Sequence, residues 1–287
     1  MQAGEAEMVR RYAPPGRSAP DRHDFALIEV IDLGCGGGRA GLALAPEGYR
    51  VTGLDITWEM TQTTRQAYLA HHLPPDVLQA DIQAIPCAAG SYDVALIFIA
   101  ALQHIPGRDA RQKTLAEIGR ILRPGGVLIL ALDNIAPALT CYGWWMWRKL
   151  TATRTPTSPD AAVQETTADS LLSSNRTTVS ALGWHLRGLA RTLRWRTWPG
   201  FVDLLRRTPL VGGEKGDTFI SQVSLTPTPG RVYYHIYEYN ELVADAAAAN
   251  LSLIACHSGR ELSENREFPP RVRQLDKQVF YAFTPKV

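Results

Sequence analysis

Short, nearly continuous apolar runs alternate with longer amphipathic segments along the first half of the chain. The run Val94–Ala101 is typical of a parallel strand that is covered on both faces. This alternation predicts right-handed crossovers and a doubly wound sheet, which binds ligands beyond the carboxyl ends of its strands. The expected elements are strands near 27–33, 50–55, 76–81, 92–99 and 126–132, and helices near 38–46, 57–71 and 109–122.

The alternation of strands and helices stops between about 134 and 230. Ala136–Leu150 is rich in aromatic residues, Thr151–Asp160 is a linker rich in Thr and Pro, and Thr167–Arg194 could supply one or two helices. We therefore expect a helical insertion after the fifth strand. The pattern then returns with a helix over Glu238–Asn250 and strands over Leu251–His257 and Gln278–Thr284.

A glycine-rich turn follows the first predicted strand. Gly34, Gly36 and Gly38 come directly after the apolar run that ends at Leu33, and Asp55 ends the second strand. Glycine permits positive φ and lets a ligand approach bare backbone, while a carboxylate at the tip of the neighbouring strand can bind both hydroxyls of a ribose. This corner therefore predicts a nucleoside site.

The spacing of the glycines separates two classes of nucleoside cofactor. Dinucleotide-binding turns run GxGxxG and place a pyrophosphate at the helix N-terminus. Here the turn runs GxGxG, and Arg39 stands where the third glycine of GxGxxG would be. Asp32, two residues before the first glycine, would repel phosphate but could hold an ammonium group. These residues favour S-adenosylmethionine (SAM), which has an amino-acid tail, over NAD.

Five blocks of sequence follow one another over roughly residues 25 to 135. They are Asp32–Gly38 (DLGCGGG), Asp55, Ala80–Ile82, Ser91–Phe98 and Leu122–Leu128. In these blocks the chain resembles the class I SAM-dependent methyltransferases. The resemblance implies an α/β fold with a Rossmann-like, doubly wound, seven-stranded sheet whose last strand is antiparallel. The break in the alternation adds a helical insertion that we expect to form a lid. The resemblance also implies SAM contacts from Asp32, Gly34, Cys35, Gly36, Gly38, Asp55, Ile56, Asp81 and Ile82.

The same resemblance divides the chain into four parts. These are an N-terminal leader or lid at 1–24, a SAM-binding core at 25–135, a mainly helical insertion over the substrate site at 136–230, and the C-terminal part of the core sheet at 231–287. The leader begins with a short helix. It could fold over the cofactor or fray as a terminus.

Candidate chemistry follows the fourth and fifth strands, which face the methyl group in this family. His104 could deprotonate a hydroxyl or orient a carboxylate, because histidine titrates near neutrality, or it could be structural, while Gln103 would position groups nearby. Asn134 could contact substrate or cap the next helix. Tyr234 and His235 could look into the substrate cleft or pack on the sheet.

Three functions fit this reading. The first is a methyltransferase acting on an oxygen, nitrogen or carbon atom of a small organic molecule in a lidded pocket. The second is a tRNA-modifying enzyme of the wobble-uridine carboxymethyl type, since Arg187–Trp198 interleaves cations with aromatic rings, although an amphipathic lid helix has the same pattern. The third is a SAM-binding protein without turnover.

Composition adds few constraints. A chain of 287 residues with 45% hydrophobic and 20% charged residues is typical of a globular enzyme, and a net charge of +2 indicates no class of partner. The four cysteines form no CxxC motif or Cys/His cluster, so we expect no metal site and no disulfide framework, and a reducing cytoplasm fits. The polar N-terminus predicts no signal peptide, and Pro137 and Asp133 interrupt the apolar stretch that could otherwise suggest a membrane span.

Overall fold

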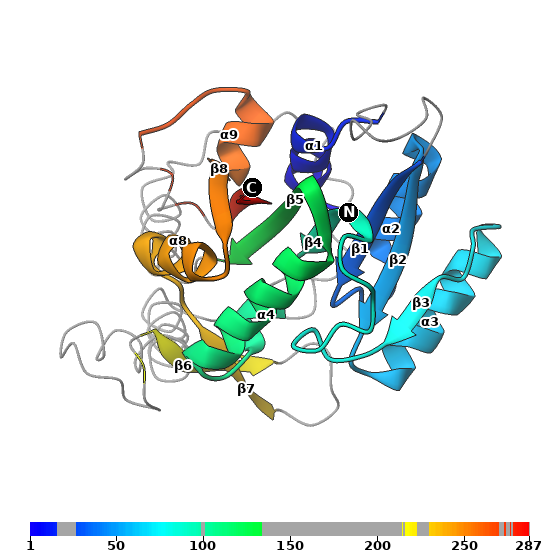
Figure 1. The fold of residues 1–287 in the computed structure, drawn as a ribbon, viewed down its shortest axis with the longest axis horizontal. Coiled ribbons are helices and arrows are strands. Elements are labelled where there is room, and N and C mark those ends of the chain that lie inside the picture. The colour runs from blue at the N-terminus through cyan, green and yellow to red at the C-terminus, as the bar shows by residue number, and fades with distance from the viewer. Residues whose placement is uncertain are drawn as a thin grey trace, which may run out of the picture.

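The structure is a computed structural model in which helices lie on both faces of one central sheet (Figure 1). It describes residues 1–15, 27–98, 101–133, 214, 216–222, 230–269, 273, 276 and 278–286. Asn134 and most of the predicted insertion, including Arg187–Trp198, lie outside these residues. No helix in the described ranges is long and apolar enough to cross a membrane.

The central sheet has seven strands in the order β3-β2-β1-β4-β5-β9-β8. The strands are β1 (Ile28–Leu33), β2 (Tyr49–Asp55), β3 (Val77–Gln79), β4 (Tyr92–Ile97), β5 (Leu122–Asp133), β8 (Leu251–Ser258) and β9 (Gln278–Pro285). Within this described sheet β9 alone runs antiparallel to its neighbours. The predicted doubly wound, seven-stranded sheet with an antiparallel last strand is therefore confirmed, and the winding reverses between β1 and β4.

The central strands are apolar on both faces. In β1, Ile31 and Leu33 face one buried cluster, while Ile28 and Val30 face the other. Successive side chains of a strand point to opposite faces, so such a strand is stable only where helices cover both sides. This explains why a continuous apolar run, and not an alternating one, marks these strands in the sequence.

Helices supply the cover for both faces. They are α1 (Ala3–Tyr12), α2 (Arg39–Leu44), η1 (Ala45–Glu47), α3 (Trp58–Ala70), η2 (Ala101–His104), α4 (Arg108–Ile121), α8 (Tyr239–Ala248) and α9 (Gly259–Glu264). Helices α4 and α8 pack on one face, and α1, α2 and α9 contribute to the cluster on the other face. Met8 and Val9 of α1 are fully buried, so this part of the predicted leader is packed and not frayed.

A separate two-stranded sheet joins β6 (Asp217–Gln222) to β7 (Gly230–His235). The register sets Asp217 opposite His235 at one end of this hairpin. Residues 217–222 belong to the stretch predicted to be mainly helical, so the described part of that stretch contains a strand instead. Strand β7 contacts η2, which brings the hairpin next to the loop that follows β4.

Candidate functional site

The glycine turn after β1 adopts the backbone conformation that the sequence predicts. Gly34, Gly36 and Gly38 have φ values of +80°, +52° and +76°, a left-handed region that other residues rarely occupy. A Cβ atom at Gly38 would lie 2.8 Å from side-chain atoms of Thr64 and Tyr68, so glycine is also required for packing. A Cβ at Gly36 would meet nothing within 4 Å, which leaves room for a ligand against the backbone.

Asp55 connects this turn to the beginning of α3. Its Oδ2 accepts a hydrogen bond from the Gly36 backbone N–H at 3.0 Å. Its Oδ1 accepts from the backbone N–H and the hydroxyl of Thr57 at 2.9 and 2.7 Å. The carboxylate therefore stands at the carboxyl end of β2 beside the open backbone of the turn, where it can bind vicinal hydroxyls.

Asp32 is a buried carboxyl in β1. The residue is only 4% exposed, and in the described ranges its side chain has no hydrogen bond or ion pair. Burial raises the pKa of Asp32 to about 7, while the nearby Arg39 guanidinium opposes this rise. A desolvated carboxyl without a direct partner fits a cationic group of a ligand, because pairing would offset its cost of burial.

Arg39, the first residue of α2, pairs with Glu5 of α1 and not with Asp32. Its Nη2 lies 3.0 Å from Glu5 Oε1, and its Nη1 bonds the other carboxylate oxygen. The Glu5 side chain is fully buried. Sequence reasoning missed Glu5, and the available signal was the arginine that replaces the third glycine of the dinucleotide pattern.

Exposed apolar side chains follow Asp55. Ile56 is 63% exposed, Trp58 is 57% exposed and Met60 is 42% exposed, although all three are large hydrophobic residues. Ile56 was predicted to contact the cofactor, whereas Trp58 was not. Apolar surface beside a hydroxyl-binding carboxylate is suited to the flat face of a nucleobase.

The remaining predicted cofactor residues have more ordinary surroundings. Asp81 follows β3, and its Oδ1 accepts from the Gln83 backbone N–H at 2.8 Å; it is exposed, and Ile82 is half-buried. Cys35 is 6% exposed, and burial raises the pKa of its thiol to about 12. A thiol that stays protonated is a poor nucleophile, so Cys35 acts as a small packing residue inside the turn.

Gln103 links three segments at the carboxyl end of the sheet. Its Nε2 donates to the carbonyls of Asp133 and His235 at 3.1 and 3.0 Å. Its Oε1 accepts from the Asp133 backbone N–H and from the Tyr234 hydroxyl, each at 2.9 Å. These contacts use both donors and both acceptor positions of the amide. Gln103 therefore holds η2, β5 and β7 together, and its amide has no donor or acceptor position left for another hydrogen bond.

His104 is oriented by the same hairpin. Its Nδ1 lies 3.0 Å from the carbonyl oxygen of Tyr233, and its ring meets the Tyr234 ring edge-on with centroids 5.3 Å apart. A carbonyl oxygen only accepts hydrogen bonds, so Nδ1 must carry the proton. In the neutral ring the unprotonated nitrogen is then Nε2, so Nε2 is the atom that can accept a proton.

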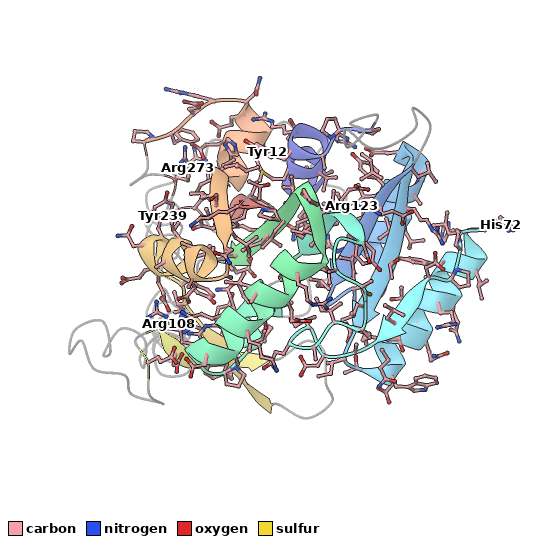
Figure 2. The ribbon with its side chains drawn as sticks, viewed as in Figure 1. Tyr12, His72, Arg108, Arg123, Tyr239 and Arg273 are labelled. Carbon is pink, nitrogen blue, oxygen red and sulfur yellow. The ribbon has the colours of Figure 1, made fainter. Side chains whose placement is uncertain are left out.

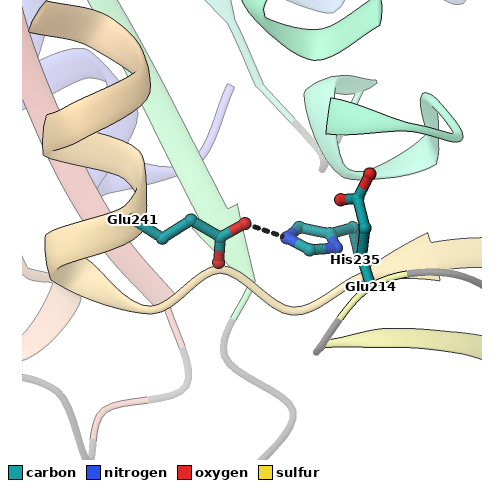
Figure 3. A group of neighbouring side chains, drawn as sticks. All are labelled: Glu214, His235 and Glu241. Carbon is teal, nitrogen blue, oxygen red and sulfur yellow. Dashed lines mark hydrogen bonds and ion pairs between the residues drawn. The ribbon is translucent and has the colours of Figure 1, made fainter. Parts of the chain in front are cut away.

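Tyr234 and His235 are both buried, at 2% and 0% exposure. His235 Nδ1 lies 2.7 Å from Asp217 Oδ1. Its Nε2 lies 2.8 Å from Glu241 Oε1, as Figure 3 shows. Both ring nitrogens are therefore held by carboxylates of the protein. The predicted substrate contact through the His235 ring finds no support in this arrangement.

A buried arginine completes the network around His235. Arg111 is fully buried, and it bonds Glu214 at 2.5 Å and the Tyr233 hydroxyl at 3.1 Å. Glu214, His235 and Glu241 have metal-binding atoms within 4.8 Å of one another. The Arg111 guanidinium already supplies positive charge to these carboxylates, so the group forms an ion-pair network between the hairpin and the core.

The start of α4 adds a second arginine to this junction. Arg108 lies beside the hairpin in Figure 2, and its Nε donates to Asp245 of α8 at 2.7 Å. Its backbone N–H donates to Glu214 at 2.6 Å. Arg108 thus joins α4 to α8 and to Glu214, which precedes β6, by charge-assisted hydrogen bonds, which are stronger than neutral ones.

Comparison with known proteins places this site in context. Residues 30–126 match a family described as methyltransferase domain. A malonyl-[acyl-carrier protein] O-methyltransferase of Enterobacter lignolyticus is 36% identical over 132 residues, which cover 45% of this chain and 49% of that protein. A ubiquinone biosynthesis O-methyltransferase of Xanthomonas oryzae pv. oryzae is 32% identical over 118 residues, covering 41% and 48%. The chain thus matches about half the length of these curated relatives.

Solved structures agree on the fold. A SAM-dependent methyltransferase from Clostridium acetobutylicum has a TM-score of 0.56 at 11% identity, with 99% of this chain and 92% of that chain covered. The CcbJ methyltransferase from Streptomyces caelestis has a TM-score of 0.54 at 16% identity, covering 99% and 90%. Likeness at such low identity concerns the fold alone. Residues 30–126 therefore resemble the methyltransferase domain family in sequence, and the chain shares its fold with solved SAM-dependent methyltransferases.

Proposed function

We propose that this chain is a SAM-dependent methyltransferase that acts on an oxygen, nitrogen or carbon atom of a small organic acceptor. Oxygen is favoured, because the relatives named above are O-methyltransferases. The observation that carries the proposal is the glycine turn with an isolated buried carboxyl, Asp32, on one side and Asp55 on the other. These groups match the ammonium group and the ribose hydroxyls of SAM.

Different residues around the glycine turn would contact different groups of the cofactor. Asp32 would pair with the ammonium group, and Asp55 would accept hydrogen bonds from the ribose hydroxyls. Ile56 and Trp58, both exposed, would cover the adenine ring. The open side of Gly36 would let the cofactor lie against the main chain. When bound, SAM supplies a methyl group on a positively charged sulfur, which is open to in-line displacement.

His104 is the proposed general base. Its Nε2 would take the proton from an acceptor hydroxyl, while Nδ1–H stays bonded to the Tyr233 carbonyl. General base catalysis contributes roughly 10² to 10⁴ in rate, and alignment of the acceptor adds to it. Gln103 would act as a positioning residue, since its amide ties η2, which contains His104, to the main chain of Asp133 in β5 and of His235 in β7.

Calorimetry tests the cofactor assignment. Asp55→Ala should weaken SAM binding by about tenfold or more, because hydrogen bonds to a charged group are worth roughly 1.5–3 kcal/mol. Asp76→Ala is the matched control, since that carboxylate precedes β3 at the other end of the strands and pairs with Arg50. Equal SAM affinity in Asp55→Ala and the parent protein would contradict the proposal.

Methyl transfer from labelled SAM then tests the acceptor class. We would offer malonyl-loaded acyl-carrier protein, a metabolite extract and tRNA in parallel, and we expect label in a small or carrier-bound acceptor. His104→Ala should lower kcat about 10²-fold with SAM affinity unchanged. Label in tRNA that falls steeply with salt would favour the RNA alternative. SAM binding without transfer to any acceptor would favour a non-catalytic role.

A further inference from the structure

We propose that Glu5 is a positioning residue of the SAM site, because it holds the Arg39 guanidinium away from Asp32 and so keeps Asp32 available for the ammonium group of the cofactor. The inference rests on the proposed SAM binding and adds a role for the N-terminal helix. It concerns three charged side chains from three elements: α1, β1 and the beginning of α2.

The Glu5–Arg39 pair has the geometry of a fixed contact. Both terminal nitrogens of Arg39 bond the two carboxylate oxygens of Glu5, with the Nη2–Oε1 distance at 3.0 Å. Such two-point pairing fixes the plane of the guanidinium as well as its position. Glu5 is fully buried, while about a third of the Arg39 side chain (34%) remains exposed. Arg39 therefore lies at the edge of the site, with its charge directed at α1.

Other contacts hold the Glu5 side chain in place, so it would not move together with Arg39. Its Oε2 also accepts from the Gln2 backbone N–H at 2.6 Å, which forms a capping box at the start of α1. Met8 and Val9, one turn further along, are fully buried against the sheet. The helix and its capping carboxylate thus provide a stationary anchor, which the helix N-terminus also stabilises electrostatically.

Asp32 is the competing partner for Arg39. The two residues flank the glycine turn, and the charge of Arg39 acts on the Asp32 carboxyl without a direct ion pair. If the Glu5 charge were removed, the half-buried guanidinium of Arg39 would lose the carboxylate that pairs with it. Pairing with the isolated Asp32 would satisfy both groups, since a buried charge is costly unless paired. The ammonium group of SAM would then have to displace a guanidinium.

The experiment compares two ligands by calorimetry. SAM has the ammonium group, whereas 5′-methylthioadenosine keeps the adenosine and lacks the amino-acid tail. Glu5→Gln should weaken SAM binding by about tenfold, or 1.4 kcal/mol, and leave methylthioadenosine within about twofold. The double variant Glu5→Gln with Arg39→Met removes the competing cation and should recover SAM affinity to within about threefold.

A matched control separates this role from simple tethering of α1. Glu47 pairs with Arg10 at 2.5 Å and so also joins α1 to the core, but it does not hold Arg39. Glu47→Gln should leave both affinities unchanged. Equal loss of SAM and methylthioadenosine in folded Glu5→Gln, unchanged SAM affinity, or no recovery in the folded double variant would each overturn the inference. A parent protein that binds neither ligand would instead overturn the proposed function.

Discussion

At the scale of single residues, Asp32 has the most unusual environment in the site. Burial raises its pKa to about 7, far above the usual value near 3.9. The folded state therefore binds this proton more tightly than the unfolded chain does. The free energy of unfolding loses this contribution as pH rises from about 4 to 7. A residue that weakens the ligand-free fold near neutral pH is typical of a functional position.

The raised pKa leads to a prediction about cofactor binding. Only ionised Asp32 can pair with the ammonium group, so SAM affinity should rise from pH 6 upward and level off above pH 7. Below the pKa the expected slope approaches tenfold per pH unit. Calorimetry at constant ionic strength measures it. Asp32→Asn should bind weakly with a flat profile, and a flat profile in the parent protein would refute the assignment.

At the scale of elements, β7 determines how η2 is held. Three consecutive residues contribute: the Tyr233 carbonyl orients His104, and Tyr234 and His235 both bond Gln103. The His235 side chain is in turn clamped between carboxylates of β6 and α8. The position of the proposed base thus depends on the ion-pair network around His235.

Removal of the clamp should therefore disturb His104. We expect His235→Gln to lower the free energy of unfolding by about 2 kcal/mol, because buried hydrogen bonds to charged groups are lost. The fraction of neutral His104 that carries its proton on Nδ1 should also fall. Long-range ¹H–¹⁵N spectra of protein labelled at histidine report both ring nitrogens directly. His71→Gln, at the end of α3, is the control. An unchanged His104 signal in His235→Gln would argue against this dependence.

At the scale of the whole molecule, the proposed cofactor site joins segments that are far apart in sequence. Glu5, Asp32 and Asp55 come from α1, β1 and β2, and the hairpin closes against η2 from more than a hundred residues away. A ligand that contacts several of these elements stabilises the folded state as a unit. Cofactor binding should therefore be visible in global unfolding.

Thermal unfolding provides the corresponding measurement. SAM at a hundredfold excess over its Kd should add about 2.7 kcal/mol to the free energy of unfolding, which corresponds to a Tm increase of roughly 5 °C for a chain of this size. Asp55→Ala at the same SAM concentration should show little increase. A Tm that does not depend on SAM would mean that the ligand does not bind the native fold.

Much of the fold could be predicted from the sequence, because the strands and the turn are each marked by residues that are close together in the chain. Apolar runs mark the strands of the central sheet, and Gly36 beside Asp55 marks the turn of the proposed cofactor site. Helix α9 has only six residues and was not predicted, since so short a segment has little periodicity. Strand β6 was also missed, because its pairing partner lies in β7 and its own sequence lacks a clear alternation.

What the sequence by itself determined is where the strands of the central sheet lie along the chain and the corner that pairs a glycine turn with an acidic strand end. Glycine conformations and strand burial depend on the residues themselves and their immediate neighbours. Only the tertiary structure decided that Arg39 pairs with Glu5, that Asp32 is left as a buried carboxyl, and that Nδ1 of His104 bonds the Tyr233 carbonyl. These properties depend on which distant group becomes the partner, and packing makes that choice.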